Sequence, residues 1–160
     1  MGTRLKVLVL GGTAFLGRHY VEAALEAGHE VTLFNRGQTN PDLFAGLEKI
    51  QGDRNRDLSP LAGRDWDAVF DPSAFVPRHV RSLLEALAGR AAHYTLVSSI
   101  SVYPLDQADK SETAPVIQLE DPATEAVTEN YGGLKALCEQ AAGELLPGRV
   151  LNVRAGLIVG

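Results

Sequence analysis

The sequence predicts an α/β domain built on a doubly wound parallel sheet, and three observations support this fold class. Short apolar runs of strand length alternate with helical patterns along most of the chain. The first run ends in a glycine-rich loop that leads into a helical pattern. The chain has 160 residues, 45% of them hydrophobic, which is enough for one domain with a substantial core. Right-handed crossovers then favour a Rossmann-type sheet with strand order 3-2-1-4-5-6 and helices on both faces.

The first half of the chain supplies four expected strands and one helix. Residues 5–10 form an aliphatic run of the kind that is buried on both faces of a sheet. Residues 15–27 repeat small and apolar side chains at helical spacing, and the glycine that follows is a natural helix stop. Strand-like composition then predicts the second, third and fourth strands over residues 30–34, 47–51 and 66–70.

The second half continues this alternation. Helical spacing predicts helices over residues 78–87 and 124–146, and β-branched and aliphatic runs predict strands over residues 94–97 and 150–153. The intervening residues 104–122 are polar, acidic and proline-containing, so we expect a surface loop of the kind that often borders a site.

Small residues at three-residue intervals mark the loop between the first strand and the first helix. Gly11 permits a tight turn, the middle position lets a pyrophosphate approach the backbone, and Gly17 lets the helix pack closely on the sheet. The helix amino terminus adds free N–H groups and a partial positive charge for phosphates. Ala14 stands at the middle position, where its methyl group fits if its φ angle is negative. The alternative is a plain connection whose glycines serve packing alone.

The composition excludes several classes of protein. The formal net charge is −5, which argues against binding of nucleic acid through bulk charge but leaves room for a local basic patch. The single cysteine, Cys138, cannot form an internal disulfide. The four histidines are scattered along the chain, so no metal site is expected. No apolar run approaches the roughly 18 residues of a membrane span and no signal peptide is apparent, so we expect a cytoplasmic protein without a membrane partner.

Several ordered motifs resemble those of the short-chain dehydrogenase/reductase superfamily, in particular its extended and atypical branches of nucleotide-sugar epimerases and dehydratases. These motifs are LVLGGTAFLG (residues 8–17), GDRNRD (52–57), WDAVFDPSAF (66–75), LVSSISVYP (96–104), YGGLK (131–135) and LNVRAGLIVG (151–160). They follow the family's order and span nearly the whole chain. The resemblance implies an NAD(P)-binding domain over residues 1–160 and a C-terminal substrate domain that would follow, so we expect the chain to be truncated.

The resemblance also implies a catalytic site made of Ser99, Tyr131 and Lys135. Tyr131 and Lys135 are four residues apart and therefore share a helix face. A nearby ammonium favours the phenolate, which takes a proton from a substrate hydroxyl while a hydride moves to the nicotinamide. In the family, the lysine also holds the nicotinamide ribose and the serine hydrogen-bonds the substrate oxygen. Ser98 and Ser101 compete for the serine's role, and a Tyr-x-x-x-Lys pair also arises by chance.

Two features depart from the family's usual pattern. Gly132 and Gly133 each weaken the helix by roughly 1 kcal/mol relative to alanine, which suggests a close approach of the backbone to cofactor or substrate. Pro104 stands where many relatives have glycine and could reshape the wall of the pocket.

The residues that follow the second, third and fourth strands bear on the cofactor. Residues 34–38 contain no carboxylate for an NAD ribose, and Arg36 could meet a 2′-phosphate, so the sequence favours NADP over NAD. The alternatives are a solvated loop cation for Arg36 and a turn aspartate for Asp53, which the resemblance places against the adenine with Arg54 beside it. The expected cofactor contacts are Gly11, Thr13, Ala14, Phe15, Leu16, Gly17, Asn35, Arg36, Asp53, Arg54, Ser73, Ala74, Tyr131 and Lys135.

The function that we expect is that of an NAD(P)-dependent oxidoreductase, epimerase or dehydratase acting on a hydroxylated small molecule, for which a nucleotide sugar is one option. One alternative is a non-catalytic relative that binds the nucleotide as a sensor or structural ligand. Another is an RNA-binding relative, which the acidic balance disfavours. By analogy with the family, the helices after the fourth and fifth strands could pair two copies into a homodimer.

Overall fold

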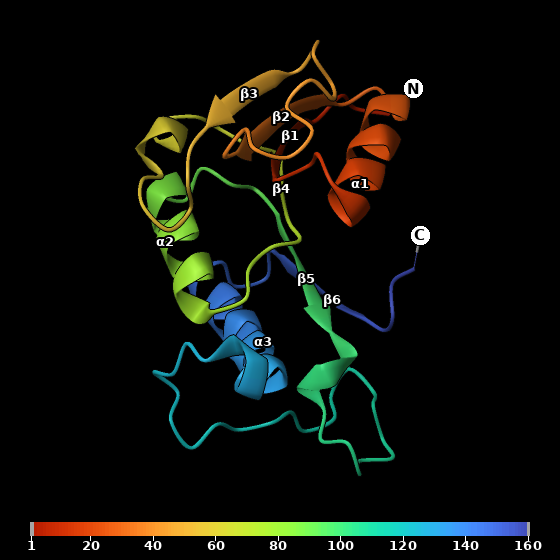
Figure 1. Cartoon of the computed structure of the whole chain (residues 1–160), viewed down its shortest axis with the longest axis vertical. Coiled ribbons are helices and arrows are strands. Elements are labelled where there is room, and N and C mark those ends of the chain that lie inside the picture. The colour runs from red at the N-terminus through yellow and green to blue at the C-terminus, as the bar shows by residue number, and fades with distance from the viewer. Residues whose placement is uncertain (1, 160) are drawn as a thin grey trace.

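The computed structural model describes residues 2–159, which contain a six-stranded parallel sheet and three α-helices (Figure 1). The strands are β1 (Lys6–Leu10), β2 (Glu30–Asn35), β3 (Glu48–Gln51), β4 (Ala68–Asp71), β5 (Tyr94–Ser99) and β6 (Val150–Ala155). The helices are α1 (Phe15–Glu26), α2 (Pro77–Leu87) and α3 (Val127–Leu145), with the single 3-10 turns η1 (Ser59–Leu61) and η2 (Ile100–Val102). Within this range, no helix is both long and apolar enough to cross a lipid bilayer.

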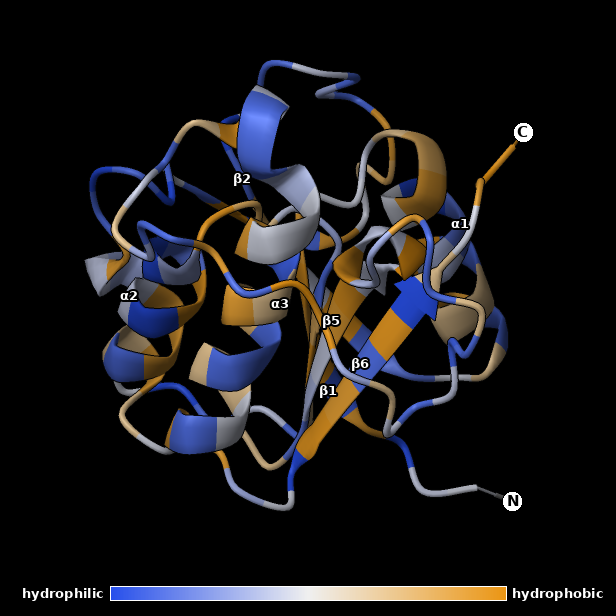
Figure 2. Cartoon of the chain, turned by 90° about the horizontal axis from the view of Figure 1, so that it is seen from below, coloured by the Kyte–Doolittle hydropathy of each residue, from blue (hydrophilic) through white to orange (hydrophobic). Residues whose placement is uncertain are grey.

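The strand order β3-β2-β1-β4-β5-β6 confirms the predicted fold class. The chain runs outward from β1 to β3, returns to the centre at β4 and then runs outward again to β6. Because crossovers between parallel strands are right-handed, this reversal places α1 on one face and α2 with α3 on the other (Figure 2). The reversal lies between β1 and β4, which is where ligands bind in sheets of this kind.

A hydrophobic core lies on each face of the sheet. Leu8 and Leu10 of β1 pack toward α2 and α3 together with Leu96 of β5, whereas Val7 and Val9 pack toward α1. Successive residues of a strand point to opposite faces, so the aliphatic run of β1 is buried on both sides, as predicted.

The element boundaries differ from the predicted ones by up to three residues. β4 begins at Ala68 because Trp66, predicted to open the strand, makes only an isolated bridge with Ala91. β5 and β6 stay paired as far as Ser99 and Ala155, two residues beyond the predicted ends. Hydrophobic patterning missed these ends because three of the four added residues, Ser98, Ser99 and Arg154, are polar, whereas the backbone ladder does not depend on side-chain polarity.

The segment between η2 and α3 forms the predicted surface loop, without helix or strand. The Tyr103 hydroxyl donates to the Ser111 carbonyl at 2.8 Å. Arg154 of β6 donates to the Glu112 carbonyl at 3.1 Å and forms an ion pair with Glu139 of α3 at 2.7 Å. Arg154 therefore ties the loop to β6 and, through its ion pair with Glu139, links both to α3.

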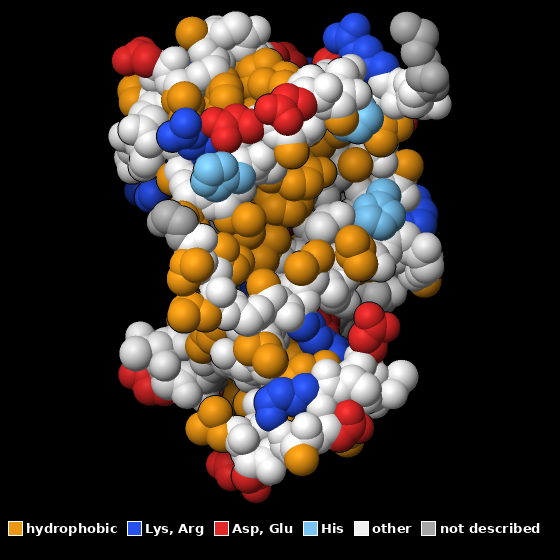
Figure 3. Space-filling model, turned by 90° about the vertical axis from the view of Figure 1, so that its right-hand side faces the viewer, with side chains coloured by type: hydrophobic (Ala, Val, Ile, Leu, Met, Phe, Trp, Pro, Cys, Tyr) orange, Lys and Arg blue, Asp and Glu red, His pale blue; other side chains and the backbone are white. Residues whose placement is uncertain are grey.

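One side of β6 has no covering helix among residues 2–159. Leu151 and Val153 point to the α1 side of the sheet and remain 51% and 39% exposed. Leu157 and Val159, which follow the strand, are exposed as well. Figure 3 shows hydrophobic side chains gathered in a band on the side of the molecule where the carboxyl terminus lies.

Candidate functional site

A cleft of about 460 Å³ opens at the carboxyl ends of β1, β2 and β4, at the point where the strand order reverses. Four loops line it, which follow β1, β2, β3 and β4 in turn. Among the predicted cofactor contacts, those in the lining are Gly11, Thr13, Ala14, Phe15, Leu16, Gly17, Asn35, Arg36, Asp53, Arg54 and Ser73. The predicted contacts Ala74, Tyr131 and Lys135 lie outside the lining.

The glycine-rich loop has the backbone shape that close approach of a phosphate requires. Gly11 and Gly12 have φ angles of 94° and 88°, in the left-handed region that favours glycine. Ala14 has a φ of −143°, so the negative angle that its methyl group needs is present. A Cβ atom on Gly17 would lie 3.0 Å from the Gly12 nitrogen, so only glycine allows α1 to pack this closely against the loop.

Phe15 begins α1 in an unusual conformation at the edge of the cleft. Its φ angle is +41° and its side chain is 50% exposed. An aromatic residue with a positive φ carries strain of order 1–3 kcal/mol, and such residues cluster at ligand sites. The first turn of α1 holds no acidic residue and its N-cap makes no side-chain hydrogen bond, so its N–H groups remain available to an anion.

Asn35 ties the loop after β2 to the glycine-rich loop. Its Nδ2 donates to the Gly11 carbonyl at 3.0 Å, and its Oδ1 accepts from the Gly37 N–H at 2.9 Å. A second link runs from the Thr13 hydroxyl to the Thr39 carbonyl at 2.7 Å. The Asn35 side chain therefore shapes the wall of the cleft through contacts within the protein.

Arg36 lies where the cleft continues into a second hollow of about 440 Å³, which Arg56 and Asp53 also line. The hydrogen bond from the Asn55 N–H, together with the nearby charges of Arg36 and Arg56, lowers the pKa of Asp53. This hollow thus combines two cationic side chains with one ionised carboxylate.

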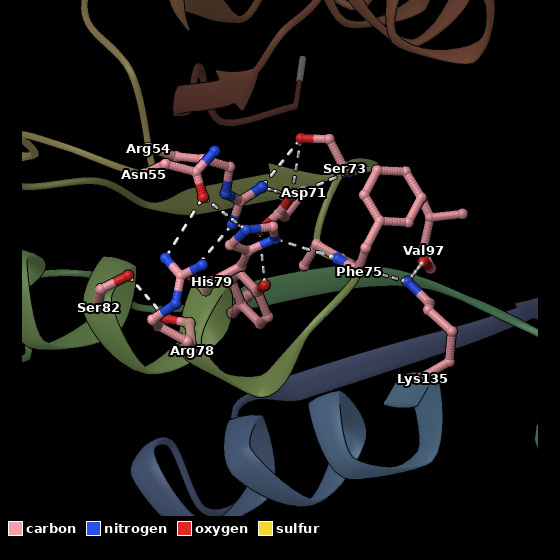
Figure 4. A network of polar contacts seen from close by, with 12 residues as sticks. Arg54, Asn55, Asp71, Ser73, Phe75, Arg78, His79, Ser82, Val97 and Lys135 are labelled. Carbon is pink, nitrogen blue, oxygen red and sulfur yellow. Dashed lines mark hydrogen bonds and ion pairs between the residues drawn. The ribbon is translucent and has the colours of Figure 1, made fainter. Parts of the chain in front are cut away.

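Arg54 and Asp71 form a buried ion pair behind the cleft (Figure 4). The guanidinium donates to both carboxylate oxygens of Asp71 at 2.8 Å, and the Tyr94 hydroxyl donates to the same carboxylate at 2.9 Å. Burial alone would raise the pKa of Asp71, but the charge and hydrogen bonds of Arg54 lower it below its usual value. The guanidinium predicted to border the adenine is therefore engaged with the protein interior, while Arg54 still contributes to the lining.

His79 continues this network to both walls of the cleft. Its Nε2 lies 2.9 Å from Asn55 Oδ1, and its Nδ1 accepts from the Phe75 N–H at 3.3 Å. Burial, followed by the charges of Arg54 and Arg78, lowers the pKa of His79 to about 4. The ring is therefore neutral at pH 7, with its proton on Nε2, donated to Asn55, and its lone pair on Nδ1.

The three predicted catalytic residues come from β5 and α3, which pack against each other. Ser99 ends β5, and its Oγ accepts from the Ser101 N–H at 3.0 Å. Ser98, its competitor, points to the opposite face because residues alternate along a strand: Ser98 lies on the α2 and α3 face and Ser99 on the α1 face. Tyr131 is half-buried and lies one turn before Lys135 on α3. Within residues 2–159, no hydrogen bond joins the Ser99, Tyr131 and Lys135 side chains to one another.

The two glycines after Tyr131 serve helix packing. A Cβ atom on Gly132 would overlap the Ser101 carbonyl oxygen, and one on Gly133 would overlap the Leu119 side chain. The close approach predicted from these glycines therefore exists, but it is to η2 and the following loop rather than to the cleft.

Sequence reasoning did not single out Asn55 and Phe75, although both line the cleft. Each follows a strand of the sheet by four residues, Asn55 after β3 and Phe75 after β4. Because the carboxyl ends of parallel strands meet at one edge, this position was the signal that could have identified them.

A family comparison covers the part of the chain that forms the cleft. Residues 7–75 match the model described as the NAD dependent epimerase/dehydratase family. This region runs from β1 to the end of the turn after β4 and includes every residue of the cleft lining.

Two curated proteins are similar to this chain over only part of their own length. The chloroplast stem-loop binding protein of 41 kDa b from Arabidopsis thaliana is 32% identical over 114 residues, which are 61% of this chain and 30% of that protein. The bifunctional pinoresinol-lariciresinol reductase 2 from Linum usitatissimum is 45% identical over 51 residues, which are 32% of this chain and 14% of that protein. The matched part thus spans less than a third of either relative.

Among solved structures, a short-chain dehydrogenase/reductase superfamily protein from Agrobacterium tumefaciens with bound NAD superposes with a TM-score of 0.70 at 22% identity. The match covers 93% of this chain and 48% of that protein. The family match, the reductase match and this shared fold confirm the resemblance to the short-chain dehydrogenase/reductase superfamily that the motifs predict.

Proposed function

From this likeness to the NAD-dependent epimerases, dehydratases and reductases, we propose that the chain binds NADP or NAD in the cleft and serves an oxidoreductase, epimerase or dehydratase reaction on a hydroxylated small molecule. The cleft carries the proposal, because the glycine-rich loop, the uncapped start of α1 and the loops after β2, β3 and β4 converge there. Its volume of about 460 Å³ suits a small-molecule ligand.

The two ends of the cleft differ, and this difference orients the dinucleotide. The pyrophosphate fits the glycine-rich loop and the start of α1, where backbone N–H groups and the helix dipole favour an anion. The adenosine half then points toward Asn35, Arg36 and Asp53. The nicotinamide half points toward Ser73 and Phe75, on the side of β4 that leads to β5 and α3.

Arg36 and Arg56 support a preference for NADP. Residues 35–39 contain no carboxylate that would favour a free ribose hydroxyl. Both guanidinium groups border the hollow that continues the cleft, where a 2′-phosphate would accept charge-assisted hydrogen bonds. Asp53 borders the same hollow, but Arg56 lies 3.9 Å from its carboxylate and offsets its charge.

The proposed reaction divides the chemistry among three side chains. The Tyr131 phenolate takes the proton of the substrate hydroxyl, and Ser99 donates a hydrogen bond to the same oxygen as a carbonyl forms. The Lys135 charge favours the phenolate. Bound oxidised nicotinamide would accept the hydride from the substrate carbon, so one proton and one hydride leave together and the alcohol becomes a carbonyl.

Calorimetric titration with NADP and, separately, with NAD tests the binding proposal. We expect tighter binding of NADP, and we expect Arg36→Ala to weaken NADP binding about tenfold or more, because a charge-assisted hydrogen bond contributes about 1.5–3 kcal/mol. The same change should leave NAD binding nearly unaltered. Arg4→Ala, an exposed arginine paired with Glu30 away from the cleft, is the matched control. Failure of both nucleotides to bind would refute the proposed function.

Tyr131→Phe tests the catalytic part separately. It should lower the rate of nicotinamide reduction by roughly 10²–10⁴-fold, because it removes the acid–base group. Nucleotide affinity should stay within about twofold, since the phenol lies outside the cleft lining. Absorbance of the reduced nicotinamide, with UDP-glucose and other hydroxylated compounds as substrates, measures the rate. Turnover that survives the substitution would contradict the assigned role of Tyr131.

The match to a stem-loop binding protein favours a second candidate, RNA binding. The net charge of −5 opposes it, because affinity for RNA rests largely on neutralising phosphates. Fluorescence anisotropy of a labelled RNA stem-loop distinguishes the two candidates. RNA binding that weakens steeply as the salt concentration rises, and that competes with NADP, would favour RNA binding as the function.

A further inference from the structure

Lys135 is shut off from the cleft that its proposed role requires it to serve. The side chain is only 1% exposed and lies outside the lining. Its Nζ donates to the Ala74 carbonyl at 2.7 Å and to the Val97 carbonyl at 2.6 Å. Two of its three N–H groups are thus bound to the backbone at the carboxyl ends of β4 and β5.

Phe75 borders both the ammonium and the cleft. Its side chain lines the cleft and is 42% exposed, and Lys135 Nζ lies 5.9 Å from the centre of its ring (Figure 4). At 5.9 Å the ammonium lies near the outer limit of a cation–π contact, so the ring attracts it only weakly. A contact this weak allows the ring to leave the ammonium when a better partner enters.

The backbone beneath the Phe75 ring is firmly held, whereas the ring is not. The Ser73 N–H donates to Asp71 at 3.0 Å, and Ser73 Oγ accepts from Arg54 at 2.9 Å. The Phe75 N–H donates to His79 at 3.3 Å. Motion at this place is therefore confined to the torsion angles of an exposed aromatic side chain, which change within nanoseconds when packing permits.

We propose that Phe75 is a gate over Lys135: the ring covers the ammonium until the nicotinamide end of a dinucleotide enters the cleft, and it then turns aside so that the ammonium meets the ligand. The identity of the ligand rests on the proposed function, whereas the covering contact does not. Lys135 would exchange its bond to the Ala74 carbonyl for one to a ribose hydroxyl, which can donate to that carbonyl in turn. The number of satisfied polar groups is then unchanged by the exchange.

Burial also lowers the pKa of Lys135 below its ordinary value. Uncovering the side chain would return the pKa toward that value and reduce the share of reactive amine. Faster modification of Lys135 therefore reports access and not a change in protonation.

Modification of the four lysines by trinitrobenzenesulfonate, read by peptide mass spectrometry, tests the gate without nucleotide. We expect Phe75→Ala to raise the rate at Lys135 about tenfold over the native protein, and Phe75→Leu, which keeps a covering side chain, to raise it about twofold or less. The exposed Lys6 and Lys110 are internal references whose rates should not change. Circular dichroism of each variant verifies the fold.

An unchanged rate at Lys135 in a folded Phe75→Ala protein would overturn the gate. Equal acceleration at Lys6 and Lys110 would overturn it as well, since it would indicate general unfolding. Adding NADP to Phe75→Ala should then slow the modification of Lys135. Loss of this protection, with the nucleotide-free difference intact, would count against the proposed function and against opening by a dinucleotide, and would leave only the covering contact standing.

Discussion

Arg54 illustrates how the surroundings of a residue decide its role. It stands in a motif that resembles a cofactor-binding segment, yet its guanidinium donates to Asp71, Ser73 and the His79 carbonyl. Asp71 is 0% exposed, so its carboxylate depends on this partner for its charge. The ion pair holds the loop after β3 against the end of β4, and it thereby fixes two walls of the cleft.

Arg54→Ala should destabilise the protein by about 3–5 kcal/mol, because it leaves the Asp71 carboxylate buried without a counter-ion. Arg56→Ala is the matched control in the same loop. Its side chain is 85% exposed, so we expect a change within about 0.5 kcal/mol. Urea denaturation at pH 7 measures both variants, and a similar loss in each would show that the buried pair is not the cause.

The pH dependence of stability follows from the same pair. The folded-state pKa of Asp71 is lowered, so its stabilisation is fully present above the unfolded value of about 3.9 and is lost as the pH falls through the folded pKa. Without Arg54, burial would raise the pKa of Asp71 instead. The variant should therefore be most destabilised relative to the native protein at neutral pH, and this deficit should shrink as the pH falls and Asp71 takes up a proton, in the same denaturation experiment.

Among the elements, α3 shows a compromise between helix propensity and packing. Gly132 and Gly133 disfavour the helix, and the break at Asn130 lies just before them. The two glycines let α3 approach η2 and Leu119, which brings Tyr131 and Lys135 toward the end of β5. The lost propensity thus serves the position of the proposed catalytic residues.

Gly132→Ala and Gly143→Ala separate these two effects on one helix. A methyl group at position 132 would overlap the Ser101 carbonyl, so we expect a loss of about 1–3 kcal/mol from the forced shift of α3. Nothing lies within 4 Å of a methyl group at exposed position 143, so there we expect a gain of about 0.5–1 kcal/mol from propensity alone. Thermal unfolding compares them, and a gain at both positions would refute the packing role of Gly132.

At the scale of the whole molecule, the two faces of the sheet are covered unequally. α2 and α3 cover one face and are joined by the ion pair of Arg81 with Glu144 at 2.8 Å. The outward residues of these helices include the charged Arg78, Arg81 and Glu144. Pairing of two copies through these helices, expected by analogy, stays a prediction that would have to rest on polar contacts.

The sequence by itself determined the fold class, the strand order and most of the cleft. Apolar runs identified the central strands, because burial on both faces demands near-continuous apolar residues, whereas the half-exposed edge strands β3 and β6 gave weaker patterns. The residues after each strand could be assigned to the cleft, because parallel strands end at one edge. Ala14 could be judged compatible with the loop, since a single methyl group needs only a negative φ.

Only the tertiary structure decided how the side chains are used. The partners of Arg54, Asn35 and Lys135 lie 17, 24 and up to 61 residues away, and no local pattern encodes such contacts. Whether such a side chain binds a ligand or another part of the protein depends on which polar groups the fold brings within hydrogen-bonding reach. A buried donor takes the nearest acceptor. For the same reason, the cover of Phe75 over Lys135 emerges only when β4, β5 and α3 are assembled.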